Sequence, residues 1–371
     1  MTIKLFAFLC SILLISSLSA ADEIKTLEIG TPAPDFNLKG VDGKMYTLKN
    51  FAKADVLVVL FSCNHCPTAQ AYEDRMIKFV NDYKDKKVSM VVISPNSDKA
   101  VQFSELGYTD LSDSYEEMII RAKDKKYNFP YLYDGATQAV SKKYGAIATP
   151  HAFVFDKARK LRYQGRIDDN EYIGKEKVHD MKNAVDALLA GQEVTTTTTK
   201  VFGCSVKWEE KSTNVNKEIE SWAKMPVSLE KVSLDQIKTL VKNEGSGKYR
   251  LINVWATWCG PCVREFTGLV ESHHMYRRRD FEFISVSMDA PKHYDKTLAF
   301  LKEKYASNKN LIYDGEDKYA FIEALDPKWQ GALPYTLLIS PEGKVVYNQM
   351  GLLDIGKLRK NIADHVGRYY D

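Results

Sequence analysis

Two pairs of cysteines, each with the spacing C-x-x-C, are the residues of this sequence whose type and spacing could do chemistry. Cys63 and Cys66 form the first pair, and Cys259 and Cys262 form the second. At the start of a helix, two cysteines at this spacing lie within one turn, where free backbone N–H groups and the helix dipole favour a thiolate. A thiolate can attack a disulfide, and the other cysteine then resolves the mixed disulfide. We expect Cys63 and Cys259 to attack and Cys66 and Cys262 to resolve.

Other uses of these cysteines fit less well. The pairs of a ribbon-type zinc site lie about 15 to 20 residues apart, whereas 192 residues (67–258) separate the two pairs here. We therefore expect no metal and no cofactor. A disulfide across two residues closes almost no loop, so it stabilises a fold little. Four free buried thiols are unusual in an exported chain. Redox chemistry is the favoured interpretation.

Strand and helix patterns place each pair at the end of a buried strand. Apolar runs and apolar residues at three- and four-residue spacing indicate strand, helix and strand in the first half, at residues 56–61, 66–83 and 88–94. The second half repeats this order at residues 251–256, 263–276 and 281–287. Each unit is a βαβ motif. The sequence therefore predicts an α/β protein with two versions of one fold.

Length and charge agree with this organisation. The 371 residues are 44% hydrophobic, which is enough for about two domains at roughly 100 to 200 residues each. The net charge is only +3, so the chain lacks the basic footprint of a nucleic-acid-binding protein. We expect no nucleic-acid partner.

The N-terminus has the pattern of a secretory signal peptide. A positive stretch at residues 1–4 precedes an apolar run at 5–15 and small residues up to Ala21. We expect residues 1–21 to be removed, together with Cys10, which leaves no stable membrane span. The mature protein would then be exported, to the periplasm in a Gram-negative bacterium. An uncleaved anchor is the alternative.

A threonine-rich tract at residues 191–200 marks a linker. We divide the remaining chain into a first domain, a linker segment and a second domain, at residues 22–192, 193–225 and 226–371. The apolar stretch 201–208 is expected to pack on the first domain. It contains Cys204, which is a third redox cysteine near the first pair, a bridge to another chain, or a small buried hydrophobe.

The second half resembles the thioredoxin superfamily, and most of all its exported TlpA-like members. The residues that carry this resemblance are W-A-T-W-C-G-P-C at 255–262 and the downstream Leu333-Pro334. The first half is similar to redoxin proteins related to AhpC/TSA, through C-N-H-C-P at 63–67, Thr149-Pro150 and G-C-S-V-K-W at 203–208. The two resemblances cover nearly the whole chain after the leader. They imply two tandem thioredoxin-like folds, each a central mixed sheet flanked by helices.

The resemblance also implies roles for residues outside the cysteine pairs. In such folds a proline is cis and faces the cysteines, and the backbone beside it binds substrate as a strand would. This role passes to Pro150 and Pro334 with their preceding residues Thr149 and Leu333. The alternative for each proline is an ordinary turn at a strand start.

A glutamate follows the second pair at the position where TlpA-like proteins have one that serves the active site. Glu265 stands three residues after Cys262 and is a candidate base for it. The alternative is a solvated glutamate in the first helical turn. Thioredoxin carries a buried aspartate six residues before its first cysteine, and this chain has Leu57 and Asn253 there. Neither side chain takes a proton.

These features favour a thiol–disulfide oxidoreductase that exchanges disulfides with protein substrates or between its own two sites. Such an enzyme needs a partner protein that donates or accepts electrons. One alternative is a thiol peroxidase, because Cys66-Pro67-Thr68 resembles the peroxidatic motif of peroxiredoxins, with Cys63 where they have threonine. A redox-inert binding module is the other alternative.

His65 lies between the cysteines of the first pair, and a protonated imidazole there would stabilise the Cys63 thiolate. Thioredoxin is a reducing couple near about −270 mV, whereas histidine-containing pairs reach about −120 mV. We therefore predict a higher reduction potential for the first pair than for the second. Redox titration of each domain measures both values, and a first pair at or below the second would contradict the prediction.

Overall fold

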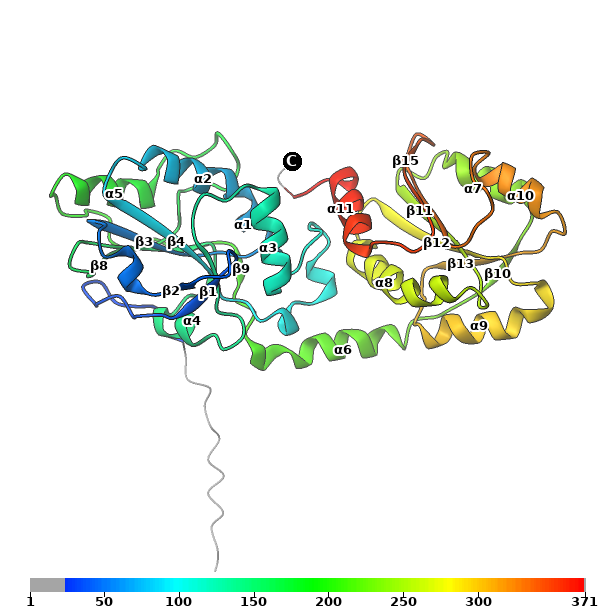
Figure 1. Cartoon of the computed structure of the whole chain (residues 1–371), viewed down its shortest axis with the longest axis horizontal. Coiled ribbons are helices and arrows are strands. Elements are labelled where there is room, and N and C mark those ends of the chain that lie inside the picture. The colour runs from blue at the N-terminus through cyan, green and yellow to red at the C-terminus, as the bar shows by residue number, and fades with distance from the viewer. Residues whose placement is uncertain (1–23, 370–371) are drawn as a thin grey trace, which may run out of the picture.

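The computed structural model describes residues 24–369 (Figure 1). The expected signal peptide at residues 1–21 lies outside the described residues. The described chain forms two large sheets, each flanked by helices, and a third sheet of two strands. The two large sheets lie side by side in separate lobes (Figure 1).

The first sheet has seven strands in the order β2-β1-β5-β4-β3-β7-β8. Its strands are β1 (Leu38–Gly40), β2 (Met45–Tyr46), β3 (Val56–Phe61), β4 (Val88–Ser94), β5 (Tyr131–Tyr133), β7 (His151–Phe155) and β8 (Leu161–Gly165). Its helices are α1 (Pro67–Ala71), α2 (Glu73–Asp82), α3 (Tyr115–Asp124), α4 (Ala139–Tyr144) and α5 (Asp180–Leu189), with 3-10 turns η1 (Leu48–Phe51), η2 (Asp98–Ala100) and η3 (Phe103–Glu105).

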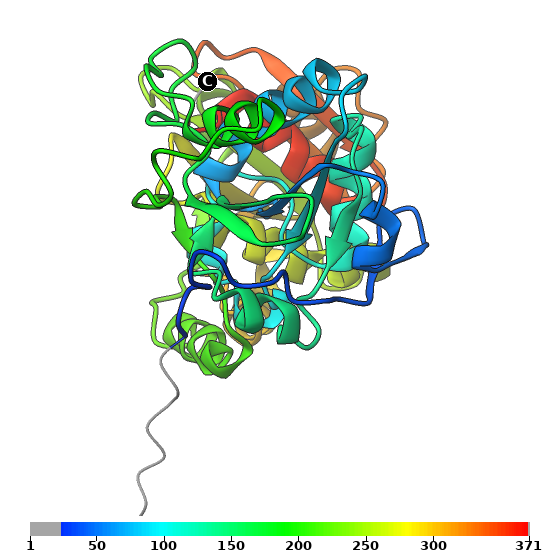
Figure 2. The ribbon, with the colours of Figure 1, turned by 90° about the vertical axis from the view of Figure 1, so that its left-hand side faces the viewer.

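The central strand β3 is buried on both faces of the first sheet. Its even-numbered residues pack with residues of α2 and α5, and its odd-numbered residues pack with residues of α4. A strand covered on both faces needs an apolar side chain at every position. Figure 2 looks from the side of this lobe, with the second lobe behind it.

The second sheet has six strands in the order β10-β13-β12-β11-β14-β15. Its strands are β10 (Glu230–Val232), β11 (Tyr249–Trp255), β12 (Phe281–Ser287), β13 (Lys309–Tyr313), β14 (Tyr335–Ile339) and β15 (Val345–Met350). Its helices are α7 (Leu234–Lys242), α8 (Gly260–Tyr276), α9 (Tyr294–Glu303), α10 (Lys318–Leu325) and α11 (Ile355–Val366), with the 3-10 turn η5 (Pro291–His293). One face packs on α7 and α10, and the other on α8, α9 and α11.

Both halves have the same central arrangement. The strand before each cysteine pair, β3 or β11, is parallel to the next strand along the chain, β4 or β12. On its other side this strand is antiparallel to β7 or β14. These two strands follow the Thr149–Pro150 and Leu333–Pro334 bonds. Each half is thus a mixed sheet flanked by helices with a thioredoxin-like fold, as the sequence predicted.

The helix expected at residues 66–83 is instead two helices, α1 and α2. The break lies at Tyr72, whose N–H donates to both Ala69 O and Gln70 O rather than to one carbonyl four residues earlier. The Tyr72 side chain is fully buried, and its hydroxyl donates to Asp168 Oδ1 at 2.6 Å. The helix is thus interrupted at Tyr72, where tertiary contacts hold the side chain. The spacing of the apolar residues does not reveal this interruption.

The segment expected as a linker is partly structured. As predicted, it packs on the first half, where β9 (Cys204–Ser205) pairs with β6 (Ala148–Thr149). Gly203 permits this approach, because a Cβ on it would lie 2.2 Å from Thr149 O. The 3-10 turn η4 (Glu209–Lys211) and helix α6 (Thr213–Trp222) follow and were not predicted. Figure 1 shows α6 running between the two lobes.

The two halves also touch through the stretch between β4 and α3. Leu106 from this stretch is buried in a core cluster of the second half. The Tyr276 hydroxyl of the second half donates to Thr109 O at 2.7 Å, and Arg279 Nη1 donates to Gly107 O at 2.7 Å. The halves are therefore joined by packing and hydrogen bonds as well as by the chain.

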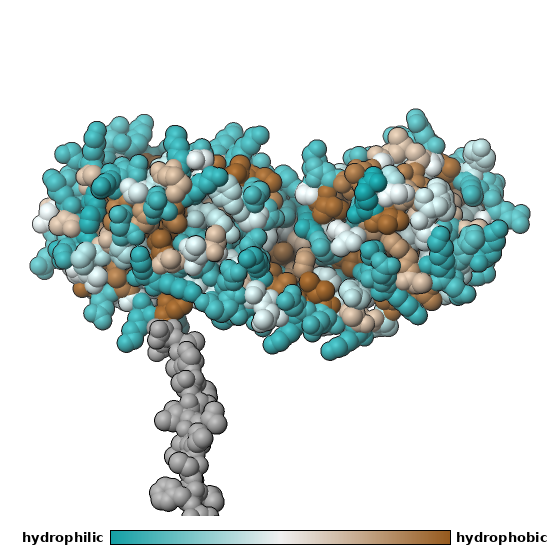
Figure 3. Space-filling model, turned by 60° about the horizontal axis from the view of Figure 1, so that its bottom comes forward, coloured by the Kyte–Doolittle hydropathy of each residue, from teal (hydrophilic) through white to brown (hydrophobic). Residues whose placement is uncertain are grey.

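Within residues 24–369, we found no helix with the length and hydropathy that a bilayer crossing requires. The face shown in Figure 3 is mostly hydrophilic, with apolar residues scattered over both lobes.

Replacing Trp222 tests whether α6 is anchored between the halves. Its indole stacks on His274 with ring centroids 3.9 Å apart and contacts Phe103 at 5.0 Å. We expect Trp222→Ala to lower the free energy of unfolding by about 3 kcal/mol, measured by urea denaturation. Trp258→Ala is the matched control, because Trp258 is 65% exposed and its loss should change stability by no more than about 0.5 kcal/mol. Equal losses for the two variants would contradict the anchoring role of Trp222.

Candidate active sites

The two cysteine pairs differ in their position relative to the helix that follows. In the second half, Cys259 is the N-cap of α8 and Cys262 lies in its first turn. In the first half, the helix begins only after the pair, so Cys66 is the N-cap of α1 and Cys63 precedes the helix. Pro67 fixes this start, since a proline at the first helical position lacks only an N–H that would be unpaired there. The expectation that both sulfurs lie within a helical turn is correct for the second pair and wrong for the first.

Thr149 contacts both sulfurs of the first pair. Its Oγ1 lies 3.1 Å from Cys63 Sγ, and its carbonyl oxygen lies 3.3 Å from Cys66 Sγ, whose thiol donates to it. The Thr149–Pro150 peptide bond is cis. The structure therefore places Thr149 against both cysteines, and the bond after it is cis, as the resemblance implied.

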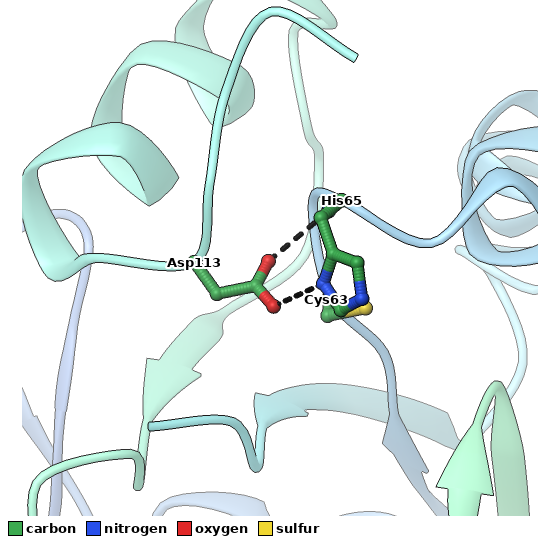
Figure 4. Close-up of side chains that lie close together, drawn as sticks. All are labelled: Cys63, His65 and Asp113. Carbon is green, nitrogen blue, oxygen red and sulfur yellow. Dashed lines mark hydrogen bonds and ion pairs between the residues drawn. The ribbon is translucent and has the colours of Figure 1, made fainter. Parts of the chain in front are cut away.

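A buried histidine and aspartate hold the loop between the two cysteines. His65 Nδ1 lies 2.5 Å from Asp113 Oδ2, and the two side chains are 1% and 0% exposed (Figure 4). Asp113 Oδ1 also accepts the backbone N–H groups of Asn64 and His65, at 2.8 and 3.1 Å. Burial alone would lower the pKa of His65, but the Asp113 carboxylate raises it above its usual value.

The electrostatic effect of His65 falls on Cys66 rather than on Cys63, which corrects the sequence-based expectation. Burial raises the pKa of the Cys63 thiol well above its ordinary value. Burial also opposes ionisation of Cys66, but hydrogen bonds from Cys204 and Cys63 and the charge of His65 hold the pKa of Cys66 well below its ordinary value. The first site therefore favours a thiolate on the second cysteine of the pair.

Cys204 lies beside the first pair, next to Cys66. Its backbone N–H donates to Cys66 Sγ at 3.3 Å, and the two side chains are hydrogen-bonded. The hydrogen bond to Cys66, together with burial, raises the pKa of Cys204. The sequence left three alternatives open for Cys204. Its position beside Cys66 favours the alternative in which it lies near the first pair.

Two polar residues of this site were missed by the sequence reasoning. Asp113 is 48 residues from His65, and only tertiary structure brings them together. Asn96 donates to Asp113 Oδ2 at 2.7 Å and accepts the N–H of Lys207 at 2.9 Å. These bonds connect the segment of Cys204 to the loop of His65. No local pattern signals either residue, because each belongs to an irregular stretch.

The second pair forms a disulfide at the end of β11. Cys259 and Cys262 are joined by a bond of 2.04 Å, and Cys259 Sγ lies 3.4 Å from Cys262 N. The Leu333–Pro334 peptide bond is cis, again as implied. A largely apolar pocket adjoins this site and is lined by Trp258, Cys259, Met288, Lys318, Ile322, Trp329, Gly331 and Leu333. A substrate in this pocket would lie against Cys259.

Glu265 is buried one turn after Cys262 on α8, so it is not a solvated first-turn residue. It is 4% exposed, and its two carboxylate oxygens accept from Asn253 Nδ2 at 3.1 Å and from Leu353 N at 2.8 Å. Burial raises its pKa from 4.5 to about 7, against these two hydrogen bonds. The Asn253 amide does not titrate, but it donates to Glu265 and so positions a carboxylate that does.

The raised pKa of Glu265 predicts a pH-dependent stability. The folded chain binds this proton more tightly than the unfolded chain, so stability falls as the pH rises from 4.5 to about 7. Glu265→Gln removes the titration. We expect the stability of the wild type to decline relative to this variant by up to about 1.4 kcal/mol per pH unit in this range, measured by urea denaturation. Parallel pH profiles for the two proteins would contradict the shift.

Comparisons with known proteins show which family the chain resembles. The AhpC/TSA family model matches residues 29–164 and 215–348. The thiol-disulfide oxidoreductase ResA of Geobacillus thermodenitrificans is 31% identical over 99 residues, which are 27% of this chain and 52% of that protein. ResA of Bacillus subtilis is 30% identical over 109 residues, or 29% and 56% of the two chains. The chain thus spans about half the length of the curated relatives it matches.

Solved structures resemble one half of the chain at a time. A hypothetical protein from Sinorhizobium meliloti 1021 is 35% identical, with a TM-score of 0.44, over 50% of this chain and 96% of its own. An uncharacterized conserved protein from Geobacillus kaustophilus is 36% identical, with a TM-score of 0.44, over 49% and 93%. Because the family model matches both halves and more than half of all residues, the chain belongs to the AhpC/TSA family, within the thioredoxin superfamily.

Proposed function

We propose that the protein is a thiol–disulfide oxidoreductase with two C-x-x-C sites that exchange disulfides with protein thiols or with each other. One observation carries the proposal: in both halves a buried strand delivers a cysteine pair to a loop that faces a cis X-Pro bond. A pair spanning two residues contributes little to stability, so its position at this junction is explained by chemistry. The names of the curated relatives support the same activity.

At the second site, Cys259 attacks and Cys262 resolves. The Cys259 thiolate forms a mixed disulfide with one substrate sulfur and releases the other as a thiol. Cys262 then attacks Cys259 Sγ, which releases the second substrate thiol and leaves the Cys259–Cys262 disulfide. Two electrons pass from the pair to the substrate. Glu265, with a pKa near 7, is suited to take the proton of Cys262.

The pocket beside Cys259 gives this site its substrate access. Trp258 is 65% exposed at its edge, and apolar side chains line most of it. An extended segment of a protein client can pair with the backbone at Leu333 and Pro334 while its apolar side chains enter the pocket. Thr149 and Pro150 have the corresponding role at the first site.

At the first site, the thiolate forms on Cys66, and Cys204 acts as a third redox cysteine. When Cys63 and Cys66 are joined in a disulfide, Cys204 can lose its thiol proton and attack Cys66 Sγ, which forms a Cys66–Cys204 bond and releases Cys63, and the released sulfur takes up a proton. This exchange needs no external oxidant. It gives the buried Cys66 a route to a cysteine that is closer to the surface.

The remaining parts of the proposal concern location and organisation. The pattern at residues 1–21 supports export, where a second protein would donate or accept the electrons. The two sheets support the division into domains at residues 22–192 and 226–371, joined by 193–225.

Peroxide reduction at the first site is a second candidate function, because the lowered pKa of Cys66 favours a nucleophilic thiolate. In that reaction Cys66 becomes a sulfenic acid and the peroxide becomes an alcohol or water. In a chain with Cys204→Ser, Cys259→Ser and Cys262→Ser, the further change Cys63→Ser separates the two functions, since disulfide exchange there needs Cys63 and peroxide consumption does not. A redox-inert binding module would show no reaction with dithiols or peroxide.

Trapping tests disulfide exchange at the second site. In a chain with Cys63→Ser and Cys66→Ser, we expect Cys262→Ala to accumulate mixed disulfides with a disulfide-bonded protein substrate, since the resolving thiol is gone. Cys259→Ala in the same background is the matched control, and it should accumulate at least about tenfold less, because Cys262 is fully buried. Non-reducing electrophoresis and mass spectrometry measure the adducts. Equal trapping by both variants, or by neither, would contradict the assigned roles.

A further inference from the structure

The imidazole of His65 has one nitrogen that the first site leaves without a partner. Nδ1 is bonded to Asp113, whereas Nε2 is buried and has no hydrogen-bond partner. The whole side chain is 1% exposed. A buried polar atom without a partner is costly and calls for an explanation, such as an ion that occupies the site. Disulfide exchange makes no use of this nitrogen.

The side chains near this nitrogen carry atoms of the kinds that bind metal ions. One ligand atom from each of Cys63, His65 and Asp113 lies within 4.8 Å of the others. Figure 4 shows the ring of His65 beside the sulfur of Cys63, with Asp113 on the opposite side of the ring. The thiols of Cys63 and Cys66 are hydrogen-bonded to each other. Two thiols and an imidazole nitrogen thus converge in one buried place.

We propose that the reduced first site binds a thiophilic closed-shell cation, Zn²⁺ or Cu⁺, through Cys63 Sγ, Cys66 Sγ and His65 Nε2, with Asp113 orienting the imidazole. Thiolate and imidazole donors suit these two ions. Metal-bound histidines commonly donate their other N–H to a carboxylate, which fixes the ring and strengthens the ligand. Asp113 is such a carboxylate, because it is hydrogen-bonded to Nδ1 of His65.

Distance and charge both fit the proposal. Metal bonds of about 2.0 Å to nitrogen and 2.3 Å to sulfur span up to about 4.3 Å end to end. The ligand atoms of Cys63 and His65 lie within 4.8 Å of each other, so small side-chain movements bring them to this span, and Cys66 is hydrogen-bonded to Cys63. Burial strongly disfavours a thiolate on Cys63. A bound cation offsets this cost. It replaces the thiol proton of Cys63 and any proton on Nε2 of His65, both of which pass to solvent, and Cys66 binds as the thiolate.

Cys204 distinguishes the two ions. Zn²⁺ prefers four ligands in a tetrahedron, and Cys204, hydrogen-bonded to Cys66, stands where it can provide the fourth. Cu⁺ needs only three ligands. We expect Cys204→Ser to weaken Zn²⁺ binding and to leave Cu⁺ binding unchanged.

The metal and the disulfide exclude each other at this site, because an oxidised pair has no thiolate to offer. The earlier expectation of no metal rested on the distance between the two cysteine pairs. The ligands proposed here come from one pair and the histidine inside it. The second pair encloses Gly260 and Pro261, which have no ligand atoms, so it is an internal control.

The test is a titration of the full chain with Zn²⁺ against a chromophoric chelator, and with Cu⁺ against a Cu⁺ chelator without oxygen. We expect one equivalent to bind to the reduced wild type and to a Cys259→Ser, Cys262→Ser variant. The oxidised wild type, which needs no substitution, and the Cys63→Ser, Cys66→Ser variant should not bind it. Asp113→Asn should weaken binding ten- to a hundredfold.

Two results would overturn the proposal. One is unchanged binding after His65→Gln in a chain whose circular dichroism matches that of the wild type. The other is loss of the bound equivalent in Cys259→Ser, Cys262→Ser, which would place the ion at the second pair. A chain that exchanges disulfides but binds no metal when reduced would reject this inference and leave the proposed function intact.

Discussion

The buried contact between His65 and Asp113 is the interaction on which the first site depends. Asp113 accepts from four donors: His65 Nδ1, the backbone N–H groups of Asn64 and His65, and Asn96 Nδ2. In a low-dielectric interior such bonds are strong, and leaving any of these groups unpaired is costly. One carboxylate therefore fixes the conformation of the loop between the two cysteines. It also raises the pKa of His65 above its usual value, and the charged form of this imidazole favours a thiolate on Cys66.

The stretch that carries Asp113 also contacts the second half. Between β4 and α3 the chain passes Leu106, which packs in the core of the second lobe, and Thr109, which accepts from Tyr276. It then reaches Asp113. Through Asn96 the same network holds Lys207, three residues after Cys204. The first site is thus assembled from segments far apart in sequence, and one of these segments also packs on the second lobe.

The sequence predicted the elements that depend on local apolar runs. The bounds of β3, β4 and β12 agree with the predicted strands, because apolar residues predominate in strands that are buried on both faces. The Thr149–Pro150 and Leu333–Pro334 bonds are cis, as the family resemblance implied. Asp113 was not predictable, since its contact with His65 spans 48 residues. The helix start after the first pair was readable from the sequence, because Pro67 marks a first helical position and makes Cys66 the N-cap.

The two sites are versions of one arrangement with opposite electrostatics. The second has a glutamate that binds a proton near neutral pH, and the first has a histidine whose pKa is raised by the Asp113 carboxylate. The assignment of the thiolate to Cys66 is tested most directly by ultraviolet titration of thiolate absorbance. The two chains compared carry Cys63→Ser or Cys66→Ser, each with Cys259→Ser and Cys262→Ser. We predict that Cys66 ionises below the ordinary thiol pKa of about 8.5 and Cys63 above it. Ionisation of Cys63 at the lower pH would contradict the role of the His65–Asp113 pair.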